Sequence, residues 1–234
     1  MTSMAEVGTW VSTFNTRHLQ GKLHILCREA EARGIQVLFL QEVAVTADAA
    51  PGLEKAARKA GWQFLYDTDD VAVSENGTPC KGVAVLTRWP ITLEVNRFKK
   101  DWPARLIFVK IHRKNRRAVR AVGVYGFAGD PDRSAVMMKG VFEYLAEKGD
   151  AWMAIGDWNA EFDEQPTVRV LTNGAARRAD EAAQGPLWGT RPGSDRNIDF
   201  AINSPALYAR ARIQWKAPVL PNGEVDSKGE PKRI

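Results

Sequence analysis

The chain has 234 residues, of which 44% are hydrophobic, so it can bury one sizeable core. Its 33 Lys and Arg residues outnumber 28 Asp and Glu residues, and the net charge of +5 favours a polyanionic partner such as nucleic acid without requiring one. It contains no apolar run long enough to span a membrane, no secretory signal and only two cysteines, so we expect a soluble intracellular protein, with the compartment left open and no membrane partner.

The first part of the chain alternates strand-like and helix-like segments, which predicts an α/β protein. A first strand ends near Asn15, and a helix with one apolar face follows over residues 21–34. A buried strand over residues 35–42 closes on Glu42. A second helix, with an alanine face, is predicted over residues 53–61.

The middle of the chain lacks helical patterns. Strand-like segments cover residues 82–87, 105–111 and 118–125, and the basic segment 112–117 connects the last two. Because no helix separates these strands, we predict an antiparallel meander with a hairpin turn at 112–117.

The last part of the chain returns to alternating elements. A helix is predicted over residues 130–149, capped by Asp132 or Ser134. A strand follows, then a short helix over 165–174 and a last strand over 196–203. These elements predict two sheets packed face to face with helices outside.

We find no internal repeat and no linker before the C-terminal end. Residues 1–215 are therefore predicted to form one domain. Residues 216–234 are rich in Pro, Gly and charged residues, and are interpreted as a tail.

Polar residues stand at the ends of several predicted strands, where propensity does not explain them. A buried carboxylate is costly unless it is paired or bound to a metal. Taken singly, Asn15 is more readily explained as a turn residue, Glu42 as a surface residue and Tyr125 as a core aromatic. Together, the oxygen and amide groups suit Mg²⁺ or Mn²⁺ rather than zinc. The residues are Asn15, Glu42, Tyr125, Asp157, Asn159 and Asp199.

The segments that carry these residues resemble the endonuclease/exonuclease/phosphatase superfamily, and they occur in that superfamily's order over about residues 8–204. The resemblance implies a four-layer α/β sandwich of the DNase I-like type, with two mixed sheets face to face and the site at the strand ends between them. The matching segments are TFNTRHL, LFLQEV, GVAVLTRWPI, GVYGFAGD, AIGDWNAE and NIDFAIN.

The resemblance also implies roles. By this resemblance, Glu42 would be the principal ligand of a Mg²⁺ or Mn²⁺ ion, with Asn15 close by as a second metal-binding residue. Asp157 accepts a proton from the attacking water, Asn159 orients that water or the phosphate, and Tyr125 holds a phosphate oxygen. These groups would supply the activated water and the charge neutralisation that phosphodiester hydrolysis needs.

The sequence departs from the family at its end, where the family has Ser-Asp-His-x-Pro. The resemblance implies that Asp199 orients that histidine, but residues 227–231 read Ser-Lys-Gly-Glu-Pro. Three interpretations stay open: a terminal strand completed elsewhere, an enzyme in which Lys228, Arg196 or Arg191 supplies the positive charge, and a relative that has lost hydrolysis.

Basic segments indicate nucleic acid, DNA more than RNA, as the substrate. Residues 97–105 and 112–120 cluster positive charge, although the second segment is explained equally well as a solvated hairpin tip. Trp102, Trp158 and Trp188 could stack on bases, but Trp158 alternates with two polar residues and is better placed in the core. The predicted substrate-binding residues are Arg105, Trp188, Arg191 and Arg196.

We therefore predict a metal-dependent phosphodiester hydrolase, a DNA endonuclease with reduced or context-dependent activity. Two alternatives stay open. One is a catalytically degenerate relative that binds nucleic acid or a protein, and the other is a phosphatase for a small phosphoester.

Overall fold

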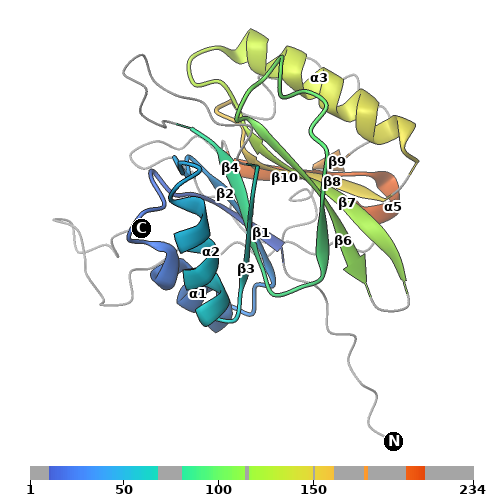
Figure 1. Cartoon of the computed structure of the whole chain (residues 1–234). Helices are drawn as coiled ribbons and strands as arrows, with labels where there is room; N and C mark the ends of the chain where they lie inside the picture. Colours follow the sequence, from blue (N-terminus) through green and yellow to red (C-terminus); the bar gives the residue numbers. More distant parts are fainter. Residues whose placement is uncertain are drawn as a thin grey trace, which may run out of the picture.

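The computed structural model describes residues 11–67, 81–113, 116–149, 151–160, 177–178 and 199–208. Two β-sheets pack face to face in this part of the chain, with α1 and α2 against the outer face of one sheet and α3 against the outer face of the other (Figure 1). Three apolar clusters fill the spaces between these four layers. The predicted four-layer α/β sandwich is confirmed.

The first sheet has four strands in the order β1-β2-β4-β3. The neighbours β1 and β2 run parallel, whereas β4 is antiparallel to both β2 and β3. Its elements and the helices that cover it are β1 (Val11–Asn15), α1 (Leu23–Ala32), β2 (Val37–Gln41), α2 (Ala50–Lys59), β3 (Gln63–Tyr66) and β4 (Val83–Thr87).

The second sheet has six strands in the order β5-β6-β7-β8-β10-β9. Within it, β7 and β8 are parallel and are connected through α3, while the other neighbours are antiparallel. Its elements are β5 (Ile91–Glu94), β6 (Leu106–Arg113), β7 (Arg116–Tyr125), α3 (Pro131–Glu147), β8 (Trp152–Asp157), β9 (Arg177–Arg178), β10 (Asp199–Asn203) and α5 (Pro205–Tyr208).

The predicted meander is only partly correct. The hairpin of β6 and β7 is present, with Arg113 paired to Arg116. However, β4 belongs to the other sheet, and three strands were not predicted: β3, β5 and the two-residue β9. The reason is that every residue of β4 is buried, so the strand has no alternation to show which sheet it joins, and β3 and β5 have only four residues each.

The helices fall close to their predicted ranges, with two differences. Helix α2 begins at Ala50, before the predicted start, because Pro51 fits the first turn. The cap predicted for the α3 segment is wrong: Asp130, not Asp132 or Ser134, accepts a hydrogen bond from the Arg133 backbone N–H. Ser134 instead accepts one from the Phe127 backbone N–H at 2.9 Å.

Some predictions lie outside the described residues: the helix at 165–174, the domain boundary after residue 215 and the tail. Among the helices that the structure describes, none is long and apolar enough to cross a membrane.

Candidate active site

The ends of four strands meet between the two sheets. Because β1 and β2 are parallel, Asn15 pairs with Gln41 at their carboxyl ends, and in the other sheet the parallel pair β7 and β8 places Tyr125 beside Asp157. Across the sheets, β1 contacts β8 and β2 contacts β7. The topology therefore brings the polar strand ends of both sheets to one rim.

A hydrogen-bonded cluster occupies this rim. The Asn15 side-chain Nδ2 donates to Glu42 Oε1 and to Asp157 Oδ2, both at 2.8 Å, although Asn15 and Asp157 are 142 residues apart in sequence. The Tyr125 hydroxyl donates to the same Glu42 oxygen at 3.0 Å. Four of the residues singled out from the sequence are thus in direct contact.

Asp157 is buried, with 4% of its surface exposed. Burial raises the pKa of this carboxyl above its usual value, and the charge of Glu42 raises it further. Hydrogen bonds from the Asn15 side chain and the Asn159 backbone N–H, the latter at 3.0 Å, act in the opposite direction. The carboxylate is therefore more basic than an exposed aspartate and is held in a fixed orientation.

Tyr125 is also buried, and burial raises the pKa of its phenol, with Glu42 adding to the effect. The phenol therefore stays protonated at any ordinary assay pH, which makes it a lasting hydrogen-bond donor. In this structure it donates to Glu42, and the phosphate contact predicted for Tyr125 stays a prediction.

Asn159 is fixed through the backbone of Gly126. Its backbone is left-handed, with φ of 52°, and its Nδ2 donates to the Gly126 carbonyl oxygen at 3.1 Å. The Gly126 N–H in turn donates to the Asp157 carbonyl at 2.7 Å. A Cβ atom at Gly126 would lie 2.0 Å from the Trp158 carbonyl oxygen, so no side chain fits there. Sequence reasoning missed Gly126, although a glycine directly after a strand is a signal for close backbone approach.

Trp158 anchors the segment that carries both polar side chains. It is 1% exposed, stacks on the Phe200 ring with centroids 5.1 Å apart, and donates from Nε1 to the Phe200 carbonyl at 2.9 Å. The prediction that Trp158 belongs to the core is confirmed. Its burial places the neighbouring Asp157 and Asn159 at the rim.

The cluster suits a hard divalent cation. It contains two carboxylates, an amide and a phenol but neither histidine nor cysteine, and oxygen ligands of this kind are those that Mg²⁺ and Mn²⁺ prefer. Among the described residues, the hydrogen bonds to the Glu42 carboxylate reach Oε1 and not Oε2. Nowhere among the described ranges do three or more His, Cys, Asp or Glu residues gather as a metal cluster, so the fit rests on two carboxylates and their neutral neighbours.

Asn15 faces the two carboxylates with its amide nitrogen. Its Oδ1 accepts from the Arg17 backbone N–H at 3.1 Å. Asn15 therefore lies between the carboxylates of Glu42 and Asp157 and donates a hydrogen bond to each. Its role as a metal ligand stays a prediction.

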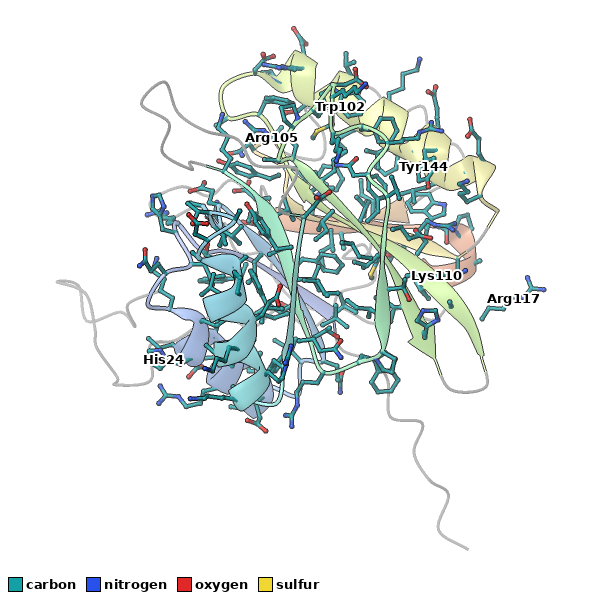
Figure 2. The ribbon with its side chains drawn as sticks, in the orientation of Figure 1. His24, Trp102, Arg105, Lys110, Arg117 and Tyr144 are labelled. Carbon is teal, nitrogen blue, oxygen red and sulfur yellow. The ribbon has the colours of Figure 1, made fainter. Side chains whose placement is uncertain are left out.

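Arg105 lies behind Tyr125 rather than on the surface. It is 6% exposed, donates to the Gly126 carbonyl at 2.6 Å, and places its guanidinium carbon 4.5 Å from the centroid of the Tyr125 ring. It supports the backbone of the site, and the substrate contact predicted for it stays a prediction. Arg117, in the other basic segment, lies at the far end of the β6–β7 hairpin from Arg105 (Figure 2).

Two further candidates have a described position. Asp199 is the first residue of β10 and pairs with Asp157 in the antiparallel register, so it starts at the same rim. Trp102 is partly buried, and its ring stacks on Phe98 with centroids 4.9 Å apart, so its contacts are those of a packed side chain. Trp188, Arg191, Arg196 and residues 227–231 lie outside the described residues.

Comparisons with known proteins agree with this geometry. The sequence model described as the Endonuclease/Exonuclease/phosphatase family matches residues 12–210. No curated protein matches the chain in sequence. Among solved structures, an AP endonuclease from Archaeoglobus fulgidus is similar, with 14% identity, a TM-score of 0.70 and coverage of 97% of this chain and 96% of that one.

Two other solved structures share the fold. A 3′–5′ exonuclease from Neisseria meningitidis has 17% identity and a TM-score of 0.64, covering 85% of this chain and 88% of that one. The endonuclease domain of TRAS1, a telomere-specific non-LTR retrotransposon, has 13% identity and a TM-score of 0.57, covering 83% of this chain and 84% of that one. At these identities the likeness establishes the fold.

Proposed function

Because the chain belongs to the endonuclease/exonuclease/phosphatase family, whose members are metal-dependent nucleases and phosphatases, we propose that it is a Mg²⁺- or Mn²⁺-dependent phosphodiester hydrolase that acts on DNA. The observation that supports this most is the contact of Asn15 with both Glu42 and Asp157. Holding two carboxylates together at the rim, with one of them buried, costs folding stability, so a functional role explains the arrangement better than stability does.

Each group in the cluster has a chemical use. A divalent ion held by Glu42, with Asn15 beside it, would neutralise charge on the phosphate and on the leaving oxygen. Asp157, whose pKa burial raises, accepts the proton of the attacking water. Asn159 orients that water or the phosphate, and the protonated Tyr125 can donate its one hydrogen bond to a phosphate oxygen in place of Glu42.

DNA is the preferred substrate class for two reasons. The net charge of +5 favours a polyanion. The similar structures include proteins named as an AP endonuclease and a 3′–5′ exonuclease. We further propose that four residues lie near the bound substrate: Asp199, Trp188, Arg191 and Arg196.

Reduced or context-dependent activity follows from the C-terminal sequence. Residues 227–231 read Ser-Lys-Gly-Glu-Pro where the family has a histidine. Losing one preorganised contact to the transition state typically lowers the rate by roughly 10²–10³. We therefore expect slow turnover, well below that of a site with the terminal histidine, rather than no turnover.

Nicking of supercoiled plasmid with and without Mg²⁺ or Mn²⁺ tests the proposal. We expect metal-dependent nicking by the wild type, and its loss in Asp157→Ala and Glu42→Ala. Glu54→Ala, which removes an exposed carboxylate from α2, is the matched control and should nick like the wild type.

Further substrates separate the alternatives. Single-stranded, double-stranded and abasic DNA define the preferred form, and release of inorganic phosphate from mononucleotides or inositol phosphates without nicking would select a phosphatase. Salt-sensitive DNA binding with no product from any substrate would select a degenerate binding protein. Nicking that survives both Asp157→Ala and Glu42→Ala would reject the assigned site.

A further inference from the structure

The loops that follow β1 and β2 contain an unusual concentration of left-handed backbone. The φ angles are 43° at Arg17, 73° at His18, 53° at Glu42 and 48° at Ala44. None of these residues is glycine, so each conformation is sparsely populated and persists only where surrounding contacts fix it. The loops are neighbours, because the His18 N–H donates to the Glu42 carbonyl at 2.9 Å.

Thr16 connects the two loops through its side chain. It is 1% exposed, and its Oγ1 lies 3.0 Å from the carbonyl oxygen of Gln41 and 3.0 Å from that of Glu42. The Thr16 backbone N–H also donates to the Gln41 carbonyl, at 2.9 Å. Among the described residues, Thr16 is the only one whose side chain donates to the Glu42 carbonyl.

The loop that carries Thr16 is itself tied down. Lys22 at the start of α1 donates from Nζ to the Thr16 carbonyl at 2.5 Å and to the Arg17 carbonyl at 3.0 Å. The hydroxyl of Thr16 is therefore presented to the Glu42 peptide from a fixed position. A hydroxyl held in this way can set the backbone torsions of the residue whose carbonyl it binds.

The backbone of Glu42 decides where its carboxylate lies. With φ of 53°, the side chain leaves the end of β2 toward the rim, where Oε1 meets Asn15 Nδ2 and the Tyr125 hydroxyl. An ordinary right-handed or extended backbone would direct the same side chain elsewhere. The orientation of the Glu42 carboxylate thus depends on the contact between the two loops.

We propose that Thr16 is a positioning residue for the metal site: its hydroxyl fixes the left-handed backbone of Glu42 and so sets the carboxylate for binding a divalent cation. This rests on the proposed function, in which Glu42 holds that cation. Groups that orient a metal ligand typically change metal affinity by roughly 10–100-fold when they are removed.

Isothermal titration of the full chain with Mn²⁺ tests the proposal, using Thr16→Val and Thr16→Ser. Valine keeps the shape and removes the hydroxyl, so we expect Mn²⁺ affinity to fall at least about tenfold. Serine keeps the hydroxyl and should bind Mn²⁺ within about threefold of the wild type. The melting temperature in EDTA, recorded for each variant, reports the loss of stability separately.

Thr13→Val is the matched control, because it removes a hydroxyl of β1 that bonds the Gln41 side chain at 2.8 Å instead of a backbone carbonyl. It should lower the melting temperature and leave Mn²⁺ affinity unchanged. Equal Mn²⁺ affinities for wild type and Thr16→Val would overturn the positioning role, as would an equal loss of affinity in Thr13→Val.

Glu42→Ala in the same titration separates this proposal from the proposed function. If Glu42→Ala loses Mn²⁺ while Thr16→Val keeps it, only the role of Thr16 fails. If the wild type binds no Mn²⁺, or Glu42→Ala binds it normally, the metal site at Glu42 fails and the role of Thr16 fails with it.

Discussion

The two sheets contribute to the site in different ways. The four-stranded sheet supplies Asn15 and Glu42, which are partly exposed and lie at or beside loops with left-handed backbone. The six-stranded sheet supplies Tyr125 and Asp157, which are buried at the ends of regular strands. Glu42 is held by hydrogen bonds between the two loops that follow β1 and β2, and Asn15 by the pairing of β1 with β2. Tyr125 and Asp157 are held by strand pairing and by the core that surrounds Trp158.

This difference indicates that the two sides of the site have different roles. A partly exposed carboxylate can exchange water for a cation at little cost, while a buried carboxylate gains basicity from its surroundings. We therefore assign cation binding to the side of Glu42 and proton transfer to the side of Asp157.

The largest effect is expected from Asp157→Asn, which keeps the shape and removes the base. Because a positioned general base contributes roughly 10²–10⁴ in rate, kcat should fall by about that factor. Mn²⁺ affinity should change much less than in Glu42→Gln, where we expect a loss of about 10-fold or more. Steady-state kinetics and Mn²⁺ titration on both variants measure this, and equal losses of Mn²⁺ affinity would contradict the different roles of the two sides.

Trp158→Ala should cost the most stability, because it empties a core position that is stacked on Phe200. Truncation of a buried Trp typically costs about 3–5 kcal/mol in the free energy of unfolding. Urea unfolding measures it. Trp102→Ala, at a partly buried position, is the control and should cost less. A Trp158→Ala cost no larger than that of Trp102→Ala would show that the core does not anchor this side.

Gly126→Ala tests the close approach of β7 and β8 at the rim. The added Cβ would lie 2.0 Å from the Trp158 carbonyl oxygen, so backbone must move, at a typical cost of about 1–3 kcal/mol. Since Gly126 also binds Asn159, kcat should fall together with stability. Gly52→Ala in α2, where a Cβ meets nothing within 4 Å, is the matched control and should not destabilise the fold.

The smallest effect is a pH dependence of stability. Burial raises the pKa of Asp157 above its ordinary 3.8, so the folded state holds this proton more tightly than the unfolded state. The stability that the protonated Asp157 carboxyl contributes to the wild type is therefore lost as the pH rises above 3.8. The melting temperature of Asp157→Asn relative to wild type should therefore increase over that pH range. A constant difference for Asp157→Asn would contradict the raised pKa.

The sequence was sufficient for the fold class and for the members of the polar cluster. Asp157 and Glu42 stand at the ends of apolar strands, and two parallel strand pairs bring such ends to one rim. It was not sufficient for β4, whose residues are all buried and so carry no alternation. Nor could it reveal the inward position of Arg105, because an arginine that binds backbone carbonyls looks in sequence like one that binds phosphate.

The role of Thr16 was hidden for a related reason. Its importance lies in a contact with the backbone of Glu42, and a carbonyl oxygen is the same for every residue type. The left-handed backbone at Glu42 was equally invisible, because glycine, the usual marker of that conformation, is not used there.

Anomalous diffraction from crystals soaked in Mn²⁺ tests most directly whether the cluster at the rim holds a divalent cation. We predict a Mn²⁺ peak with a Glu42 carboxylate oxygen at about 2.1 Å, next to Asn15 and Asp157. A protein that nicks DNA with Mn²⁺ but shows its anomalous peak away from Glu42 would contradict the account.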